Sequence, residues 1–223
     1  MTIDIPYKEL KPLINSPRLP EFASIINELL TVEESERIAF YNRITEKDKA
    51  EFINGEVIFH SPVKLWHSNA SKLLSRLMSI YADINDLGLV GYEKLMISLS
   101  RNDYEPDIVF FRKEKAEQFK PTQMRFPAPD LIVEILSKST EANDRGVKFE
   151  DYAAHGVEEY WIIDPELKIV EQYLLGESKA YELKLKASDG TLKSQAISGF
   201  SIPVQAIFDR KENNAVLQKL YQQ

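Results

Sequence analysis

The stretch that decides the fold runs from Pro129 to Pro165 and reads PDLIVEILSKSTEANDRGVKFEDYAAHGVEEYWIIDP. It opens with an apolar run that is typical of a strand covered on both faces. A segment suited to a helix follows, with Thr140 as a candidate N-cap and Gly156 as a candidate C-cap, and the short apolar strand YWIID closes the stretch. The stretch therefore predicts a strand, a helix and a second strand in succession.

The segments before this stretch extend the pattern. DYEPDIVFF and LMISLS indicate two more strands, joined by a hairpin near residues 101–103. Before them, residues 65–84 carry apolar side chains at helical spacing, and Asn54-Gly55 is a two-residue hairpin signal within the range 50–60. The middle of the chain thus predicts the order α-β-β-β-α-β.

The flanks add smaller elements to this core. The proline-rich residues 1–20 predict an irregular leader, and residues 21–47 predict one or two helices. After the core, IVEQYLL, AYELKLK and SQAI predict strands around the turn signal at 188–190, with a short helix near 210–221. We expect an α+β fold with a mixed sheet in a single domain over residues 1–223. The parts expected are a core at about 50–170, an N-terminal helical extension at 1–49 and a C-terminal β-rich extension at 171–223.

Composition narrows the classes of protein. The chain has no cysteine, which excludes disulfides and thiolate metal sites. The start MTIDIPYKEL lacks the features of a signal peptide, and no apolar run approaches the roughly 18 residues of a membrane span, so we expect a cytoplasmic protein that does not enter membranes. The net charge of −7 argues against simple electrostatic coating of nucleic acid. It does not exclude a nuclease, because a bound divalent cation offsets a cluster of carboxylates.

Two acidic residues stand inside apolar strands. Glu134 interrupts LIVEIL, and Asp107 precedes IVFF. A lone acid in a strand most often lies at a strand end or pairs with Arg or Lys, because burying an unpaired carboxylate is costly. Two acids on neighbouring strands can come within a few ångströms of each other, where their repulsion requires a cation or a shared proton. Mg²⁺ (or Mn²⁺) is the natural cation, because it prefers oxygen ligands.

The helix after the Glu134 strand carries a lysine. Asp144, Lys148 and Tyr152 are spaced by four residues and so share one helical face. The short SKST connection brings this helix close to the end of the strand, where the lysine could reach a phosphate oxygen or a metal-bound water. The alternative is a surface Asp–Lys pair, worth about 0.2–0.5 kcal/mol.

Together these residues resemble a known pattern. The α-β-β-β-α-β order, the Pro106-Asp107 pair and Glu134 are similar to the PD-(D/E)xK nuclease superfamily. The stretch at 129–165 resembles more specifically the Uma2 (DUF820) family of restriction-endonuclease-like proteins, which are common in cyanobacteria. NGEVIFHSP and the following helix with His67 also fit that family. The resemblance covers roughly residues 45–170.

The resemblance implies that Asp107 and Glu134 bind the metal and act in catalysis. The superfamily lysine should follow two residues after Glu134, where this chain has Leu136, and Lys138 has the wrong strand parity to replace it. In this family the following helix appears to supply the lysine, which implies Lys148. The expected supporting residues around the site are Glu56, His67, Asp144 and Tyr152.

Three functions remain open at this point. The first is a Mg²⁺-dependent endonuclease that hydrolyses DNA phosphodiester bonds. The second is an inactive nuclease-fold protein that binds nucleic acid or a partner protein, which the acidic composition and Leu136 favour. The third is a metal-free hydrolase in which the two acids serve as general acid and base, although no sugar-binding aromatic cleft surrounds them. The three histidines lack zinc-ligand spacing, and we expect a homodimer with candidate edges at the 50–60 hairpin and the strands after residue 168.

Overall fold

A computed structural model describes residues 10–222, which divide into two compact units, one ending at Phe59 and one beginning at His60. The part of the expected leader before residue 10 lies outside the described residues, and the single-domain organisation stays a prediction.

The first unit begins with helices where an irregular leader was expected from residue 10 onward. The helices are α1 (Lys11–Ile14) and α2 (Leu19–Arg43), and each carries a proline in its first turn. The expectation was wrong because proline is tolerated there: the first N–H groups of a helix have no intrahelical acceptor.

The expected hairpin is confirmed as β1 (Ala50–Ile53) and β2 (Glu56–Phe59). Asn54 and Gly55 have φ angles of 51° and 87°, the positive values that a tight hairpin turn requires. Phe52 of β1 packs against Phe40 of α2, with ring centroids 5.7 Å apart, and both side chains are fully buried.

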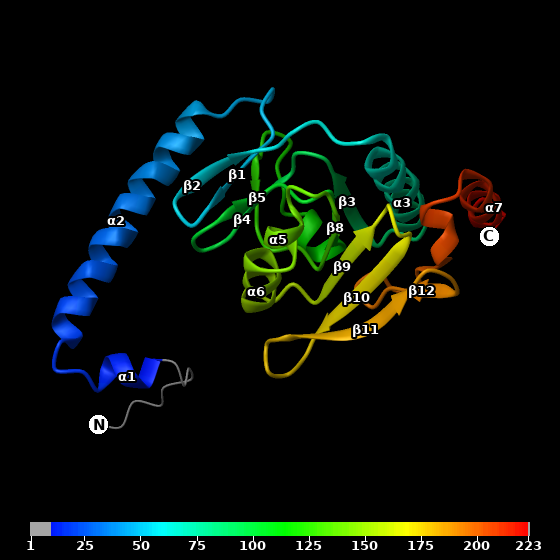
Figure 1. The fold of residues 1–223 in the computed structure, drawn as a ribbon. Helices are drawn as coiled ribbons and strands as arrows, with labels where there is room; N and C mark the ends of the chain where they lie inside the picture. The colour runs from blue at the N-terminus through cyan, green and yellow to red at the C-terminus, as the bar shows by residue number, and fades with distance from the viewer. Residues whose placement is uncertain (1–9, 223) are drawn as a thin grey trace. The chain divides into compact units, whose positions relative to one another are not determined.

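The second unit is built on a six-stranded mixed sheet with the strand order β11-β10-β9-β8-β6-β3 (Figure 1). β8 and β9 are parallel, and the other neighbouring pairs are antiparallel. The strands are β3 (Gly88–Tyr92), β6 (Ile108–Arg112), β8 (Leu131–Ile135), β9 (Glu159–Asp164), β10 (Ile169–Leu175) and β11 (Tyr181–Ala187). The expected α+β class with a mixed sheet is confirmed.

Smaller elements complete this unit. β4 (Met96–Ser98) pairs antiparallel with β5 (Asp103–Tyr104) and parallel with β7 (Arg125–Phe126), while β12 (Thr191–Lys193) pairs with β13 (Ser201–Pro203). The helices are α3 (Leu65–Ile84), α4 (Lys113–Ala116), α5 (Glu141–Asp144), α6 (Val147–Ala154), the 3₁₀ helix η2 (Val204–Ile207) and α7 (Arg210–Leu220). No helix among residues 10–222 is long and apolar enough to span a membrane.

The large sheet has helices on both faces. The apolar side of α3 packs into a core with Ile108, Leu131, Val133 and Ile135, and α7 packs beside α3 (Figure 1). Side chains of a strand alternate between faces, so Glu134 points to the opposite face from Val133 and Ile135. That face carries α6, whose side chains contact Glu134.

Several details differ from the sequence expectations. The first core strand is β3 rather than LMISLS, which forms β4 of the smaller sheet, and DYEPDIVFF splits between β5 and β6. A β-carbon at Gly91 would lie 2.7 Å from the Leu95 side chain and 2.9 Å from Val109, so the close packing here requires glycine. Because glycine is uncommon in strands, the sequence did not indicate this one. SQAI is not a strand, and β12 and β13 form instead.

The helix expected from Thr140 to His155 is interrupted at Gly146 and forms α5 and α6. A β-carbon at Gly146 would lie 2.7 Å from the Ala142 carbonyl oxygen. The Thr140 side chain makes no capping bond, because its hydroxyl is 3.0 Å from that of Ser137 instead. Gly156 ends the helix with φ of 77°, as expected.

Candidate functional site

The two strand acids meet at the end of β6 and β8. The antiparallel register pairs Ile108 with Val133, so the next pair in that register is Asp107 opposite Glu134. Directly opposed residues of antiparallel strands have β-carbons about 4.5–5.5 Å apart and share a face of the sheet. The fold therefore brings together the two carboxylates that the sequence singled out.

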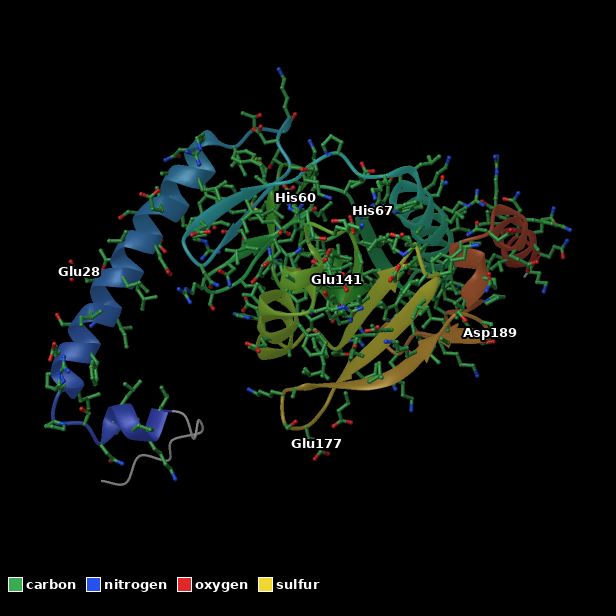
Figure 2. The ribbon with its side chains drawn as sticks, viewed as in Figure 1. Glu28, His60, His67, Glu141, Glu177 and Asp189 are labelled. Atoms are coloured by element: carbon green, nitrogen blue, oxygen red, sulfur yellow. The ribbon has the colours of Figure 1, made fainter. Side chains whose placement is uncertain are left out.

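Asp107 is held from two directions. The backbone N–H of Ile135 donates a 2.8 Å hydrogen bond to Asp107 Oδ2, and His67 Nε2 lies 3.3 Å from the same oxygen. His67 sits in the first turns of α3, as labelled in Figure 2. Asp107 and His67 are buried, with 8% and 7% of their surface exposed. The histidine predicted as a supporting residue thus contacts a carboxylate of the pair.

Glu134 is held by α6. Lys148 Nζ and the Tyr152 hydroxyl each donate a 3.0 Å hydrogen bond to Glu134 Oε1. All three side chains are buried. These two hydrogen bonds from α6 hold the carboxyl group of Glu134 in a fixed position.

Lys148 has a second acidic partner. Its ammonium lies 3.2 Å from Asp144 Oδ1, and its side chain is only 2% exposed. The Tyr104 ring lies 5.8 Å from the ammonium, and Tyr104 in turn packs edge-on against Tyr152. The Asp144–Lys148 spacing therefore produces a buried charge cluster instead of an exposed surface pair.

The break between α5 and α6 is anchored on the sheet. Arg145 donates to Glu171 of β10 at 2.7 Å and to Glu141 at 3.0 Å. Burial by itself would raise the pKa of Glu171, but hydrogen bonds from Arg145, Tyr173 and Lys186 lower this pKa to about 2. The hydrogen bonds from Arg145 to Glu171 and Glu141 raise the pKa of Arg145. This ion pair fixes the start of α6 and hence the position of Lys148.

A polar network behind Lys148 was not predicted. Asp151 Oδ2 accepts hydrogen bonds of 2.7 Å from the Tyr104 hydroxyl and from the Asn102 amide. His155 Nδ1 lies 2.9 Å from Asp151 Oδ1, and His155 Nε2 is 2.9 Å from the Ser100 hydroxyl. The i,i+4 spacing of Asp151 and His155 is the one local signal for this network, and the partners come from the loop between β4 and β5 and from Tyr104 of β5.

The carboxylate pair fits a divalent metal by its chemistry. Within residues 10–222 no group of three or more His, Cys, Asp or Glu side chains is arranged to hold a metal. Mg²⁺ does not need such a cage, because it is commonly held by one or two carboxylates and keeps several waters. Asp107 and Glu134 supply hard oxygen donors at neighbouring positions, since Asp107 accepts the N–H of Ile135, the residue after Glu134.

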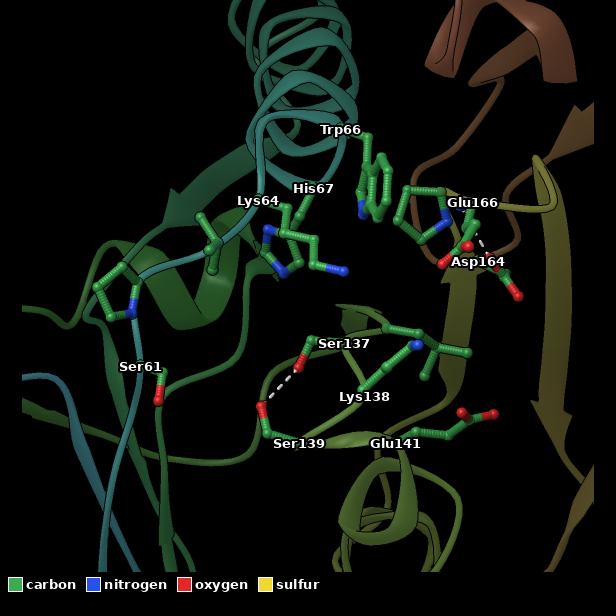
Figure 3. A pocket seen from close by; sticks show the side chains of 14 residues that line it. Ser61, Lys64, Trp66, His67, Ser137, Lys138, Ser139, Glu141, Asp164 and Glu166 are labelled. Carbon is green, nitrogen blue, oxygen red and sulfur yellow. Dashed lines mark hydrogen bonds between the residues drawn. The ribbon is translucent and has the colours of Figure 1, made fainter.

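A cavity of about 320 Å³ opens beside the pair (Figure 3). It is lined by the start of α3 and the residues before it (61–67), by residues 136–141 after β8 and by residues 164–166 after β9. His67 lines this cavity and also contacts Asp107. The cavity therefore lies next to the carboxylate pair.

The remaining predicted residue, Glu56, is an exposed residue of β2 in the first unit. Its role stays a prediction. In the second unit the structure brings together Asp107, Glu134, Lys148, His67, Asp144 and Tyr152.

Comparisons with known proteins show a family and a fold that this chain resembles. The model of the Uma2 family, described as "Putative restriction endonuclease", matches residues 32–205. Two uncharacterized proteins of Synechocystis sp. (strain PCC 6803) are similar: sll1609 is 31% identical over 56% of this chain and 72% of its own length, and slr1290 is 30% identical over 65% and 70%. A crystal structure of a protein described as a putative nuclease belonging to DUF820, from Anabaena variabilis, matches the fold. Its TM-score is 0.65 at 18% identity, over 76% of this chain and 94% of that one.

Proposed function

Because the chain belongs to the Uma2 family, we propose that it is a Mg²⁺-dependent endonuclease that hydrolyses phosphodiester bonds of DNA, with Mn²⁺ able to replace Mg²⁺. The observation that carries the proposal is the meeting of three groups: Asp107 opposite Glu134, with the Lys148 ammonium 3.0 Å from Glu134. Two carboxylates and a cation on one sheet face suit the transfer of a phosphoryl group to water.

Asp107 and Glu134 would hold the metal ion. When bound, Mg²⁺ polarises the phosphate and lowers the pKa of a water molecule. Asp107 is positioned for this by the Ile135 N–H and by His67, and Glu134 by Tyr152 and Lys148. Buried carboxylates that are already oriented bind a cation without first losing side-chain entropy.

Lys148 supplies positive charge where negative charge develops. Its ammonium would orient the attacking water or stabilise the charge on the phosphoryl oxygens. Asp144 and Glu134 hold the ammonium in place, at 3.2 and 3.0 Å. Burial strengthens its effect, because electrostatic interactions are larger in a site of low dielectric constant.

The test is cleavage of supercoiled plasmid with Mg²⁺ or Mn²⁺ by the wild-type chain and by Asp107→Asn and Lys148→Met. Lys184→Met serves as a matched control, because Lys184 is an exposed residue of β11 outside the site. We expect cleavage by the wild type and by the control, and its loss in the two site variants. Cleavage that persists in both site variants would reject the site.

The second candidate is a nuclease-fold protein that binds nucleic acid or a partner without cutting. Leu136 at the usual lysine position favours it, as does the engagement of Lys148 with two carboxylates. Calorimetric titration with Mn²⁺ separates the two candidates, because the enzyme requires heat of binding that Asp107→Asn abolishes. The cytoplasmic location and the homodimer stay predictions, and sedimentation of the purified chain checks the latter.

A further inference from the structure

We propose that the N-terminus of α3, together with His67, Lys64 and Lys138, forms a subsite for one backbone phosphate of DNA, next to the phosphate that is cleaved. The inference rests on the proposed function for its choice of DNA as the source of the phosphate. The subsite lies in the cavity of about 320 Å³ beside the carboxylate pair (Figure 3).

The first observation is the helix terminus itself. α3 has 20 residues, and its N-cap, Lys64, makes no side-chain capping bond. The first backbone N–H groups of a helix have no intrahelical acceptor, and the helix dipole places partial positive charge at this end. Residues 61–64, 66 and 67 line the cavity, so this terminus borders it. An anion is the natural ligand for such a terminus.

The second, independent observation is a buried ring nitrogen. His67 has a side chain that is 9% exposed, and its Nδ1 has no hydrogen-bond partner among residues 10–222. The other ring nitrogen, Nε2, faces Asp107. A buried polar atom without a partner is costly, and a phosphate in the cavity would satisfy it. An N–H at Nδ1 would donate to a phosphate oxygen in the cavity.

Two lysines add positive charge. Figure 3 shows the side chains of Lys64 and Lys138 pointing into the cavity from different segments of the chain. The Lys64 ammonium lies 4.7 Å from the centre of the Trp66 ring, and this cation–π contact holds it at the mouth of the cavity. Lys138 therefore differs in role from the missing motif lysine: it would bind the phosphate of the subsite and not the phosphate that is cleaved.

Acidic residues limit the subsite to a single phosphate. Glu141, Asp164 and Glu166 also line the cavity, on the side away from Lys64 in Figure 3. Glu141 is paired with Arg145, and Asp164 accepts the N–H groups of residues 166 and 167 at 2.9 Å. A second phosphate on that side would meet these carboxylates. The charges thus favour one phosphate on the side of Lys64 and His67, within reach of Lys138, and no continuous phosphate track.

The test measures binding without cleavage. A fluorescein-labelled DNA duplex is titrated with each chain in EDTA, and the dissociation constant is followed by anisotropy from low to moderate salt. We expect Lys64→Gln/Lys138→Gln to bind several-fold more weakly and to reduce the slope of log K against log salt by about 0.9, the value for one phosphate. Lys184→Gln is the matched control and should retain the wild-type slope. Trp66→Leu should weaken binding more than Trp66→Phe, which keeps an aromatic face for Lys64.

Thermal melts first confirm that each variant is folded. Four outcomes then support or overturn the subsite. An unchanged slope in the double variant overturns the subsite even when the wild type cleaves plasmid. Lysine-dependent binding by a chain that never cleaves supports the subsite and rejects the endonuclease. A chain that neither binds nor cleaves rejects both. Quenching of the exposed Trp66 by inorganic phosphate but not by the duplex would assign the subsite to free phosphate and overturn the DNA proposal.

Discussion

Replacing Lys148 by methionine tests the charge cluster most directly. The side chain is 2% exposed and contacts Glu134 and Asp144, whose side chains are 5% and 1% exposed. Methionine retains much of the volume but leaves two buried carboxylates without their ammonium. Removing one member of a buried ion pair costs about 3–5 kcal/mol, because the remaining charge is desolvated and uncompensated. We expect a loss of that size in the free energy of unfolding.

The assay is equilibrium unfolding in urea, followed by tryptophan fluorescence. Both tryptophans, Trp66 and Trp161, belong to the second unit, so the signal reports on the unit that carries the site. Lys184→Met controls for the loss of one exposed charge and should change stability by less than about 0.5 kcal/mol. Tyr152→Phe removes one hydrogen bond to Glu134 and should cost about 1.5–3 kcal/mol. If Lys148→Met is as stable as the control, the buried carboxylates do not depend on this lysine and the reasoning fails.

Three further predictions concern the frame around the site. Glu159→Ala should lower the free energy of unfolding in urea by about 3–5 kcal/mol, because Glu159 is a fully buried acceptor. Its carboxylate accepts hydrogen bonds from the side chains of Trp161, Gln172 and Ser194 and from two backbone N–H groups. A loss below about 1 kcal/mol would contradict this. Glu171 has a folded pKa of about 2 against an ordinary 4.5, so its contribution is present above pH 4.5 and lost as the pH falls toward 2. The urea midpoint should therefore decline more steeply over that range in the wild type than in Glu171→Gln, and equal profiles would speak against the ion pair. Asn213→Ala leaves the carbonyls of residues 73 and 206 without their 2.8 and 2.7 Å bonds and should cost about 1–3 kcal/mol, measured as a drop in melting temperature; an unchanged melt would show that water replaces the amide.

The sequence singled out the acids and the lysine of the candidate site because their signals are local. Asp107 and Glu134 are conspicuous as acids inside apolar strands, and the four-residue spacing of Asp144, Lys148 and Tyr152 places them on one helical face even though Gly146 interrupts the helix. These signals depend only on strand parity and helical period. For the same reason α3 and the hairpin at Asn54-Gly55 were predicted with correct boundaries or nearly so.

The rest depends on contacts between distant segments. β3 contains two glycines, and only the close approach of Leu95 and Val109 explains why a strand needs glycine there. Likewise, no local pattern links His67 to Asp107, since 40 residues separate them in the chain and the contact follows from the packing of α3 against the sheet. The Asp151 network was missed because its partners, Asn102 and Tyr104, lie about 50 residues earlier in the chain.

Under the proposed assignment, carrying the lysine on α6 changes what position 136 can do during evolution. In the superfamily pattern that strand position is committed to the reaction, so it cannot vary. Here Leu136 lies in the wall of the cavity, two residues from Glu134, while the Lys148 ammonium is carried by α6. A relative could therefore replace this side chain and reshape the entrance for a different DNA target without altering the groups that perform hydrolysis. Moving the lysine to a helix separates the choice of substrate from the chemistry, and each can then diverge independently.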